Sequence, residues 1–179
     1  MSDDDQLPSA TVPDWSREAK RVFAWSPSRS LLAAIRAHRR ASGPFARAKR
    51  RWAIERHRFW SIVTGADIPI DSRIEGGLLL PHPNGIVVHP HATIGPNCLL
   101  FQQVTIGATL RGTPTLGGHV DVGAGAKIIG PVTIGDHAQI GANAVVTTDI
   151  PAGAIAVGIP ARIVRRGSDQ VREDGARGI

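Results

Sequence analysis

Five of the seven histidines lie between residues 82 and 137, and imidazole is the side chain best suited to proton transfer near neutral pH. A histidine can accept the proton of a hydroxyl group while that hydroxyl attacks an electrophile. Three histidines can instead hold a zinc ion. The residues alone leave both chemistries open for His82, His89, His91, His119 and His137.

Several other chemistries lack their sequence signals. The chain contains neither a Walker loop nor a dinucleotide-binding fingerprint. Its single cysteine, Cys98, cannot form an internal disulfide and indicates a reducing compartment. No apolar run approaches the ~20 residues that span a bilayer, and the acidic start Met1–Asp5 is unlike a signal peptide. We therefore expect a cytoplasmic protein without a membrane span.

The 179 residues divide into two compositions. Between Arg17 and Arg58 lie 13 of the 21 basic residues, and all four tryptophans lie within the first 60 residues. Between Gly65 and Gly158 lie 16 of the 20 glycines and few charges. We expect four segments: a disordered tail (1–13), a basic helical segment (14–63), a Gly-rich domain (64–166) and a flexible C-terminal tail (167–179).

The Gly-rich part repeats every six residues, each repeat led by an aliphatic side chain. A period of six fits neither an α-helix nor a long strand, but it fits a short strand followed by a corner. Three such sides close a coil of about eighteen residues, so we predict a little over four coils whose leads stack inward. Glycines supply corners that need positive φ or close backbone approach. The predicted leads are Ile68, Ile74, Leu80, Val88, Ile94, Leu100, Ile106, Leu116, Val122, Ile128, Ile134, Ile140 and Val146.

The period breaks twice, and each break predicts a loop at a corner. Two residues are inserted between Leu80 and Val88, where His82 lies, and four between Ile106 and Leu116. Solenoid cores tolerate such insertions, and functional sites often lie on them. Both loops are candidate parts of an active site.

The N-terminal third predicts two or three short helices, one over 46–63, with Asp14 or Ser16 as a cap for an earlier one. We expect its tryptophans and leucines to pack on the Gly-rich domain and its arginines to face solvent. Binding of RNA, single-stranded DNA or an anionic membrane is the alternative. No nucleic-acid motif supports that alternative, and we expect no nucleic-acid partner.

An ordered set of short motifs resembles the serine acetyltransferase family of hexapeptide-repeat transferases, over about residues 62–166. The resemblance implies a mainly β fold, a left-handed parallel β-helix with a short helical N-terminal segment. It implies an acetyl-CoA-dependent O-acetyltransferase that works as a homotrimer or a dimer of trimers. The motifs are GADI (65–68), HPNGIVV (82–88), QVTIG (103–107), GAGAKI (123–128) and GIPARIV (158–164).

The resemblance also implies residue roles. His82 is the expected catalytic base, and Asp67, fifteen residues earlier, is expected to orient its imidazole. No metal is expected, and the histidine spacing of a zinc carbonic anhydrase of this fold does not occur. The residues expected to bind the CoA part of the donor are Gly107, Ala108, Ala124, Gln139, Ala142 and Arg162.

The sequence departs from the family where the amino-acid substrate is held. Pro81 stands where the family has an aspartate, and Gly112 and Thr113 stand where it has an Arg-His pair for the serine carboxylate. We assign the missing positive charge to Arg111. L-Serine is the first hypothesis for the acceptor, with synthesis of O-acetyl-L-serine for cysteine biosynthesis. A sugar hydroxyl in polysaccharide biosynthesis is the alternative, and a non-catalytic scaffold is a third hypothesis.

Overall fold

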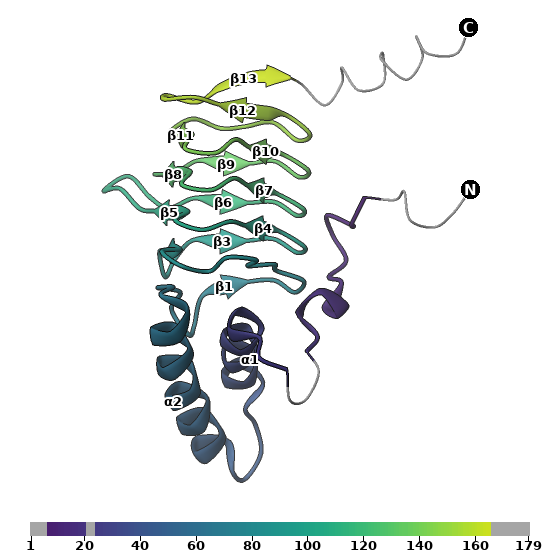
Figure 1. Cartoon of the computed structure of the whole chain (residues 1–179), viewed down its shortest axis with the longest axis vertical. Coiled ribbons are helices and arrows are strands. Elements are labelled where there is room, and N and C mark those ends of the chain that lie inside the picture. Colours follow the sequence, from purple (N-terminus) through teal and green to yellow (C-terminus); the bar gives the residue numbers. More distant parts are fainter. Residues whose placement is uncertain (1–6, 21–23, 166–179) are drawn as a thin grey trace, which may run out of the picture.

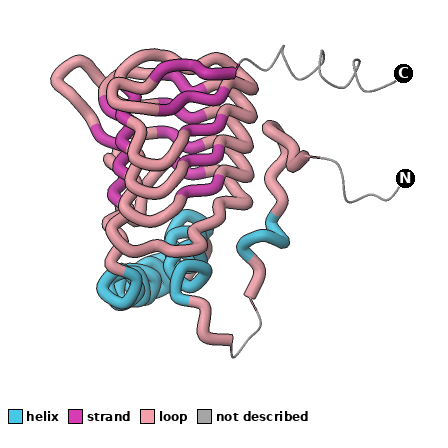
Figure 2. Tube along the Cα trace, turned by 45° about the horizontal axis from the view of Figure 1, so that its top comes forward, coloured by secondary structure: helices cyan, strands magenta, loops and turns pink. Residues whose placement is uncertain are grey.

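The computed structural model describes residues 7–20 and 24–165, which form a column of stacked coils with helices at one end (Figures 1 and 2). Each coil contributes one short strand to each of three parallel sheets. Isolated bridges at Asp67, Leu79 and Ile150 extend the sheets, so that each side has five parallel rungs. The solenoid therefore has about five coils, because it continues past Val146, the last predicted lead.

Each sheet is named here by its first strand. The β1 sheet holds β1 (Arg73–Ile74), β3 (Thr93–Ile94), β6 (Thr115–Leu116) and β9 (Thr133–Ile134). The β2 sheet holds β2 (Val87–Val88), β5 (Thr105–Gly107), β8 (Lys127–Ile129) and β11 (Val145–Val146). The β4 sheet holds β4 (Leu99–Leu100), β7 (Asp121–Val122), β10 (Gln139–Ile140), β12 (Ile155–Val157) and the antiparallel β13 (Arg162–Arg165).

The predicted leads form the interior of the column. All thirteen are buried, and strand register stacks them in three ladders. In the β2 sheet, for example, Val88, Ile106, Ile128 and Val146 lie directly above one another. The repeat prediction is therefore confirmed residue by residue.

The corners use two kinds of small or polar residue. Glycines that directly follow a lead have ordinary φ, but a side chain there would collide with the next coil: a Cβ on Gly95 would lie 2.4 Å from the Gly117 carbonyl carbon. Positive φ occurs instead at other corner positions, including five that are not glycine. Asparagine and histidine tolerate this left-handed conformation better than most residues. The five are Asn97, Gln103, His119, His137 and Asn143.

Among the described residues, two α-helices and a 3-10 helix precede the solenoid. They are η2 (Trp15–Glu18), α1 (Pro27–Arg40) and α2 (Ala46–Thr64), and Asp14 caps η2 by accepting a hydrogen bond from the Ser16 N–H at 2.9 Å. α1 buries Leu31, Leu32 and Ile35 in the same core as the first coil, so it covers the open end of the solenoid. Within the described residues, no helix is long and apolar enough to span a bilayer.

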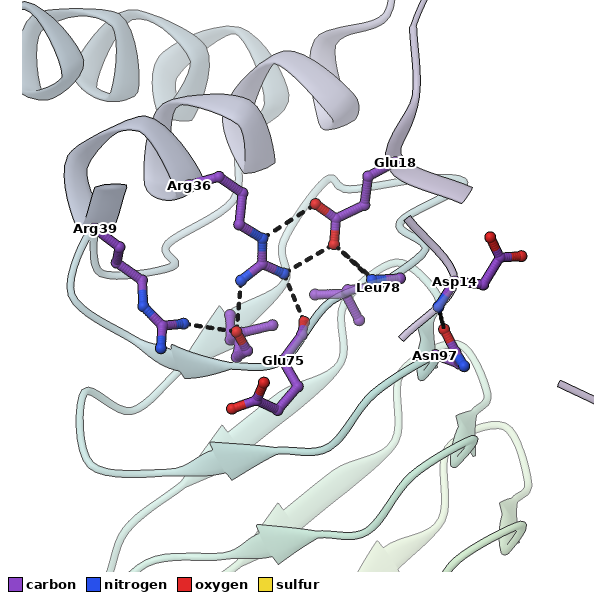
Figure 3. Close-up of polar contacts among 9 residues, drawn as sticks. Asp14, Glu18, Arg36, Arg39, Glu75, Leu78 and Asn97 are labelled. Carbon is purple, nitrogen blue, oxygen red and sulfur yellow. Dashed lines mark hydrogen bonds and ion pairs between the residues drawn. The ribbon is translucent and has the colours of Figure 1, made fainter. Parts of the chain in front are cut away.

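A buried ion pair fixes α1 and η2 to the first coil (Figure 3). Arg36 on α1 and Glu18 on η2 lie 2.8 Å apart, with side chains only 10% and 8% exposed. Glu18 accepts hydrogen bonds from the N–H groups of Gly77 and Leu78, while Arg36 donates to the carbonyls of Ile74 and Glu75. These contacts satisfy backbone groups that a terminal coil would otherwise leave without partners.

The expected disordered tail differs from the structure in part. Residues 1–6 lie outside the described residues, as do 167–179. Residues 9–14, however, run along the solenoid, where Asn97 donates to the Ser9 and Val12 carbonyls. Asn97 also accepts a hydrogen bond from the Asp14 N–H (Figure 3). The side chain of one corner asparagine thus fixes this segment, a long-range contact that local composition does not encode.

The helical segment also differs from the packing prediction. Leu31 and Leu32 are buried as expected, and Trp60 packs against the core. Trp25 and Trp52, in contrast, are 74% and 66% exposed. The expectation that the tryptophans pack on the solenoid was therefore wrong for these two, because they lie on helix and loop surfaces that face away from it.

Candidate active site

His82 lies on the loop formed by the first insertion, at the end of the solenoid that carries the helices. The loop lines a hollow of about 420 Å³ together with residues of both helices, among them Pro27, Ser28, Val63 and Thr64. The His82 side chain is exposed. The sequence motifs assign no site residue to the helical segment, and only the tertiary structure shows that this segment contributes walls to the hollow.

Asp67 lies on the first rung of the β2 sheet, directly beneath Val87. Its backbone N–H donates to the Ile86 carbonyl at 2.8 Å, and its carbonyl accepts from the Val88 N–H at 2.9 Å. Its side chain faces outward and is exposed. Asp67 thus lies in the layer beneath the segment that follows His82, as expected. Among the described residues no hydrogen bond joins the two side chains, so their pairing stays a prediction.

A column of corner residues leads away from the His82 loop. Asn84 follows His82 by two residues, and its carbonyl accepts from the Gln103 N–H at 2.9 Å. The same corner then repeats upward: the Gln102 carbonyl accepts from Gly125, and the Ala124 carbonyl accepts from Asn143 at 2.8 Å. Because adjacent rungs lie ~4.8 Å apart, Ala142 lies three rungs, or about 14 Å, along the axis from Asn84.

A groove runs beside this column over the β4 sheet. It has a volume of about 290 Å³, and its walls include Phe101, Gly123, Gln139, Ala142 and Ile155. In the β4 sheet, strand register places Val157 on the rung after Gly141 and pairs Val157 with Arg162 on β13. The Arg162 side chain is exposed. Ala124 and Ala142 therefore lie in the corner column that begins at the His82 loop, and Arg162 lies at the far end of the adjacent row. Gln139 lies three residues before Ala142 on the same coil.

The other predicted site residues lie at the opposite edge of the β2 sheet. Gly107 ends β5, and Ala108 begins the second inserted loop, which projects from the solenoid (Figure 1). Thr109 and Gly112 exchange backbone hydrogen bonds at 3.0 and 3.2 Å, which leaves Arg111 exposed at the tip. Within one chain, the structure does not bring these residues to the groove.

Two groups in this region were not predicted from sequence. Asp121 lines the groove from the rung below Gln139, and burial raises the pKa of its carboxyl, opposed by His119 and Arg17. Asp121 and Gln139 are eighteen residues apart, each directly before a lead, so the repeat itself was the signal for their stacking. Phe101, two rungs below Gly141, was missed in the same way.

The other four histidines of the solenoid form two pairs. His89 and His91 lie at the corner after β2, with ring centres 5.5 Å apart and His91 exposed. The Nδ1 atoms of His119 and His137 lie 2.9 Å apart, so one imidazole donates and the other accepts. Burial lowers the pKa of His119, opposed by Asp121 and assisted by His137 and Arg17.

The described part of the chain contains no group of three or more His, Cys, Asp or Glu side chains placed to hold one metal ion. Cys98 is fully buried at an inward position, and burial raises the pKa of its thiol to about 12. Its S–H donates to the Gly117 carbonyl at 3.2 Å. Reactive cysteines require an accessible thiolate, so Cys98 is a packing residue.

Comparisons with known proteins agree with this architecture. The profile of the family described as "Bacterial transferase hexapeptide (six repeats)" matches residues 113–148. A serine acetyltransferase of Synechococcus elongatus is 39% identical over 114 residues, which cover 62% of this chain and 47% of that protein. Serine acetyltransferase 5 of Arabidopsis thaliana is 38% identical over 174 residues, which cover 92% of this chain and 56% of the relative. The chain therefore spans about half the length of the curated relatives it matches.

Solved structures extend the likeness to the fold. A serine acetyltransferase in complex with CoA superposes with a TM-score of 0.66 at 33% identity, over 78% of this chain and 58% of that one. Soybean serine acetyltransferase complexed with serine gives 0.63 at 34% identity, over 77% and 56% of the two chains. The predicted fold class, a left-handed parallel β-helix with a short helical N-terminal segment, is thereby confirmed.

Proposed function

This chain is a relative of the serine acetyltransferases, and we propose that it transfers the acetyl group of acetyl-CoA to the hydroxyl group of L-serine. The observation that carries the proposal is the line from Arg162 along the groove to the His82 loop. Arg162 supplies a cation at one end of this line, His82 supplies a base at the other, and small residues lie between them. This arrangement suits acetyl-CoA, a long molecule with phosphates at one end and a thioester at the other.

In the proposed reaction His82 accepts the proton of the serine hydroxyl as its oxygen attacks the thioester carbonyl carbon. The carbon–sulfur bond then breaks, and the CoA thiolate takes a proton as it leaves. Asp67 orients the imidazole and stabilises its protonated form, as the acid of a hydrolase triad does. Arg111 binds the carboxylate of the amino acid.

We further propose a homotrimer or a dimer of trimers. The groove of Gln139 and Ala142 lies at one edge of the β2 sheet, and Gly107, Ala108 and Arg111 lie at the other. A neighbouring copy that presents its projecting loop to this groove unites the two groups in one site. We place the assembly in the cytoplasm, where acetyl-CoA is available and Cys98 stays reduced.

The test is CoA release from acetyl-CoA, followed with a thiol reagent, across a panel of L-serine, L-homoserine, free sugars and nucleotide sugars. Saturable release with L-serine is expected. Release with a sugar alone would contradict the acceptor while keeping the donor and the base. If the protein binds acetyl-CoA but releases no CoA with any acceptor, then no member of the panel is a substrate, and L-serine as the acceptor is contradicted.

A further inference from the structure

One side of α2 carries a row of exposed apolar side chains, called here the aromatic stripe. It consists of Trp52, Phe59 and Val63, spaced seven and four residues apart and therefore on one side of the helix, together with Phe45, the N-cap residue seven positions before Trp52. The four are between 39% and 70% exposed. The residues of α2 that are buried, Ala53 and Thr64, lie on a different side.

The stripe has an aromatic neighbour that enlarges it. Trp60 contacts Phe59 with ring centres 5.0 Å apart and contacts Trp25 at 5.6 Å. Trp25 itself is 74% exposed. Soluble surfaces rarely gather large apolar side chains in this way unless the patch binds something.

The charge of the same helix is strongly positive. α2 contains six arginines and lysines against one acid, Glu55. Lys49 and Arg56 lie three residues before and four residues after Trp52, so these two cations flank the stripe. Within the described residues, the one ion pair on α2 is the exposed contact of Arg58 with Glu55.

We infer that this face of α2 docks on an anionic membrane surface. Tryptophan and phenylalanine beside arginine and lysine are the combination by which helices lie in the headgroup region of a bilayer. The cytoplasmic leaflet is anionic and attracts such cations. Two other occupants fit less well: a second copy of α2 would oppose its six cations with six more, and single-stranded nucleic acid favours a charged groove rather than a convex helix.

The position of α2 gives the docking a consequence. α2 lies beside α1 at the end of the molecule that holds β1, with β12 and β13 at the far end (Figure 1). The stripe ends at Val63, which also lines the hollow that contains His82. A docked chain therefore holds that hollow close to the headgroups. The inference does not depend on the proposed acetyltransferase activity.

The test is flotation of the full chain with vesicles of phosphatidylcholine, with or without phosphatidylglycerol. We expect binding to the anionic vesicles alone, weakened by salt. Trp52→Ser with Phe59→Ser should weaken it by about tenfold or more, because two large apolar side chains no longer enter the interface. Val12→Ser, which changes an exposed apolar residue away from α2, is the matched control.

A second pair of variants separates charge from apolar contact. Lys49→Gln with Arg56→Gln should weaken binding by about tenfold or more, whereas Arg73→Gln, an exposed arginine on the solenoid, should not. Circular dichroism and thermal unfolding verify that each variant is folded. Equal binding by wild type and the stripe variant would overturn the inference. Absence of wild-type binding to the anionic vesicles would also overturn the inference. If the stripe variant then lowered the mass of the assembly, the stripe would be a contact between copies, and if it lowered the affinity for a single-stranded RNA, the stripe would bind nucleic acid.

Discussion

At the scale of single residues, the account depends on His82 and on what surrounds it. The sequence resemblance selected His82 among five histidines, and the structure supplies the context that the residue alone lacked. His82 lies at the base of the corner column, beside a hollow, whereas the other four histidines occupy corners as two pairs. His119 and His137 have a conformational reason for their positions, since both have positive φ.

Replacing His82 by alanine should lower turnover by about 10²- to 10⁴-fold, the usual contribution of a general base. Acetyl-CoA binding and the mass of the assembly should not change, because the exposed side chain supports neither the groove nor the ladders. Asp67→Asn should lower turnover less than His82→Ala does. Steady-state rates and equilibrium binding of acetyl-CoA check both variants, and wild-type rates in both would show that the dyad is assigned wrongly.

The half-buried pair of His119 and His137 predicts how stability depends on pH. Because the pKa of His119 is lowered in the folded state, the unfolded chain binds a proton more readily. Its contribution to stability is thus present above the ordinary pKa of ~6.5 and is lost as the pH falls towards the lowered value. The pKa of Asp121 is raised in the folded state, so its contribution to stability has the opposite trend. That contribution is present at acid pH and is lost as the pH rises through the raised pKa of Asp121.

His119→Asn isolates the histidine, since asparagine tolerates the positive φ of this corner. The variant should lose less stability than wild type between about pH 6.5 and pH 5. Urea unfolding midpoints across that range make the comparison, with His91→Asn at an exposed corner as the control. Parallel pH profiles for wild type and His119→Asn would contradict the role assigned to burial.

At the scale of elements, the solenoid was predictable and the attachment of its N-terminal segment was not. The thirteen leads follow from a local period, because each coil repeats the same short strand and corner. For the glycines at corners, the sequence leaves two explanations, positive φ or close backbone approach. At Gly95 and Gly117 the structure shows close backbone approach. The contact of Asn97 with residues 9–14, in contrast, joins positions more than eighty residues apart and has no periodic signal.

The glycines allow binding to be separated from folding. A Cβ on Gly107 would lie 2.9 Å from the Ile129 Cδ1 atom, the end of a flexible side chain, so Gly107→Ala should cost below about 1 kcal/mol. A Cβ on Gly123 would lie 2.6 Å from the Ala142 backbone nitrogen, so Gly123→Ala should cost about 1–3 kcal/mol or more. Urea unfolding measures both costs. The proposal predicts a higher KM for acetyl-CoA in folded Gly107→Ala, and an unchanged KM would remove Gly107 from the site.

The ion pair beneath α1 predicts a large effect of one substitution. Arg36→Met removes the cation and leaves the Glu18 carboxylate buried without its partner, so stability should fall by about 3–5 kcal/mol. Thermal unfolding checks this value. The exposed pair of Arg58 and Glu55 offers the control, because Arg58→Met should change stability by less than about 1 kcal/mol. Equal effects of the two substitutions would show that the buried pair does not fix α1 to the first coil.

At the scale of the whole molecule, one chain presents two incomplete halves of the proposed site. Sequence analysis placed Gly107, Ala108 and Arg111 with Ala124 and Ala142, because the family motifs do not state which copy supplies each residue. The two groups lie at opposite edges of the β2 sheet, so the width of that sheet separates them. Linear motifs therefore predict which residues belong to the proposed site, but the distances between those residues depend on the proposed assembly.

The helical end of the molecule shows the other limit of prediction. Composition identified a basic, aromatic segment, and the Leu31 and Leu32 contacts confirm that part of it packs on the solenoid. Whether Trp52 faces the core or the solvent depends on how α2 is rotated against the first coil, and the exposure of Trp25 depends on the path of the loop before α1. Composition does not contain that information.

The most direct test of the central claim is to identify the product. The full chain is incubated with acetyl-CoA and L-serine, and the amino acid is analysed by mass spectrometry beside the same reaction with His82→Ala. The account predicts serine that gains one acetyl group on its oxygen, together with free CoA, in the wild-type reaction and almost none in the variant. Unmodified serine with the wild-type protein, or equal product with His82→Ala, would contradict it.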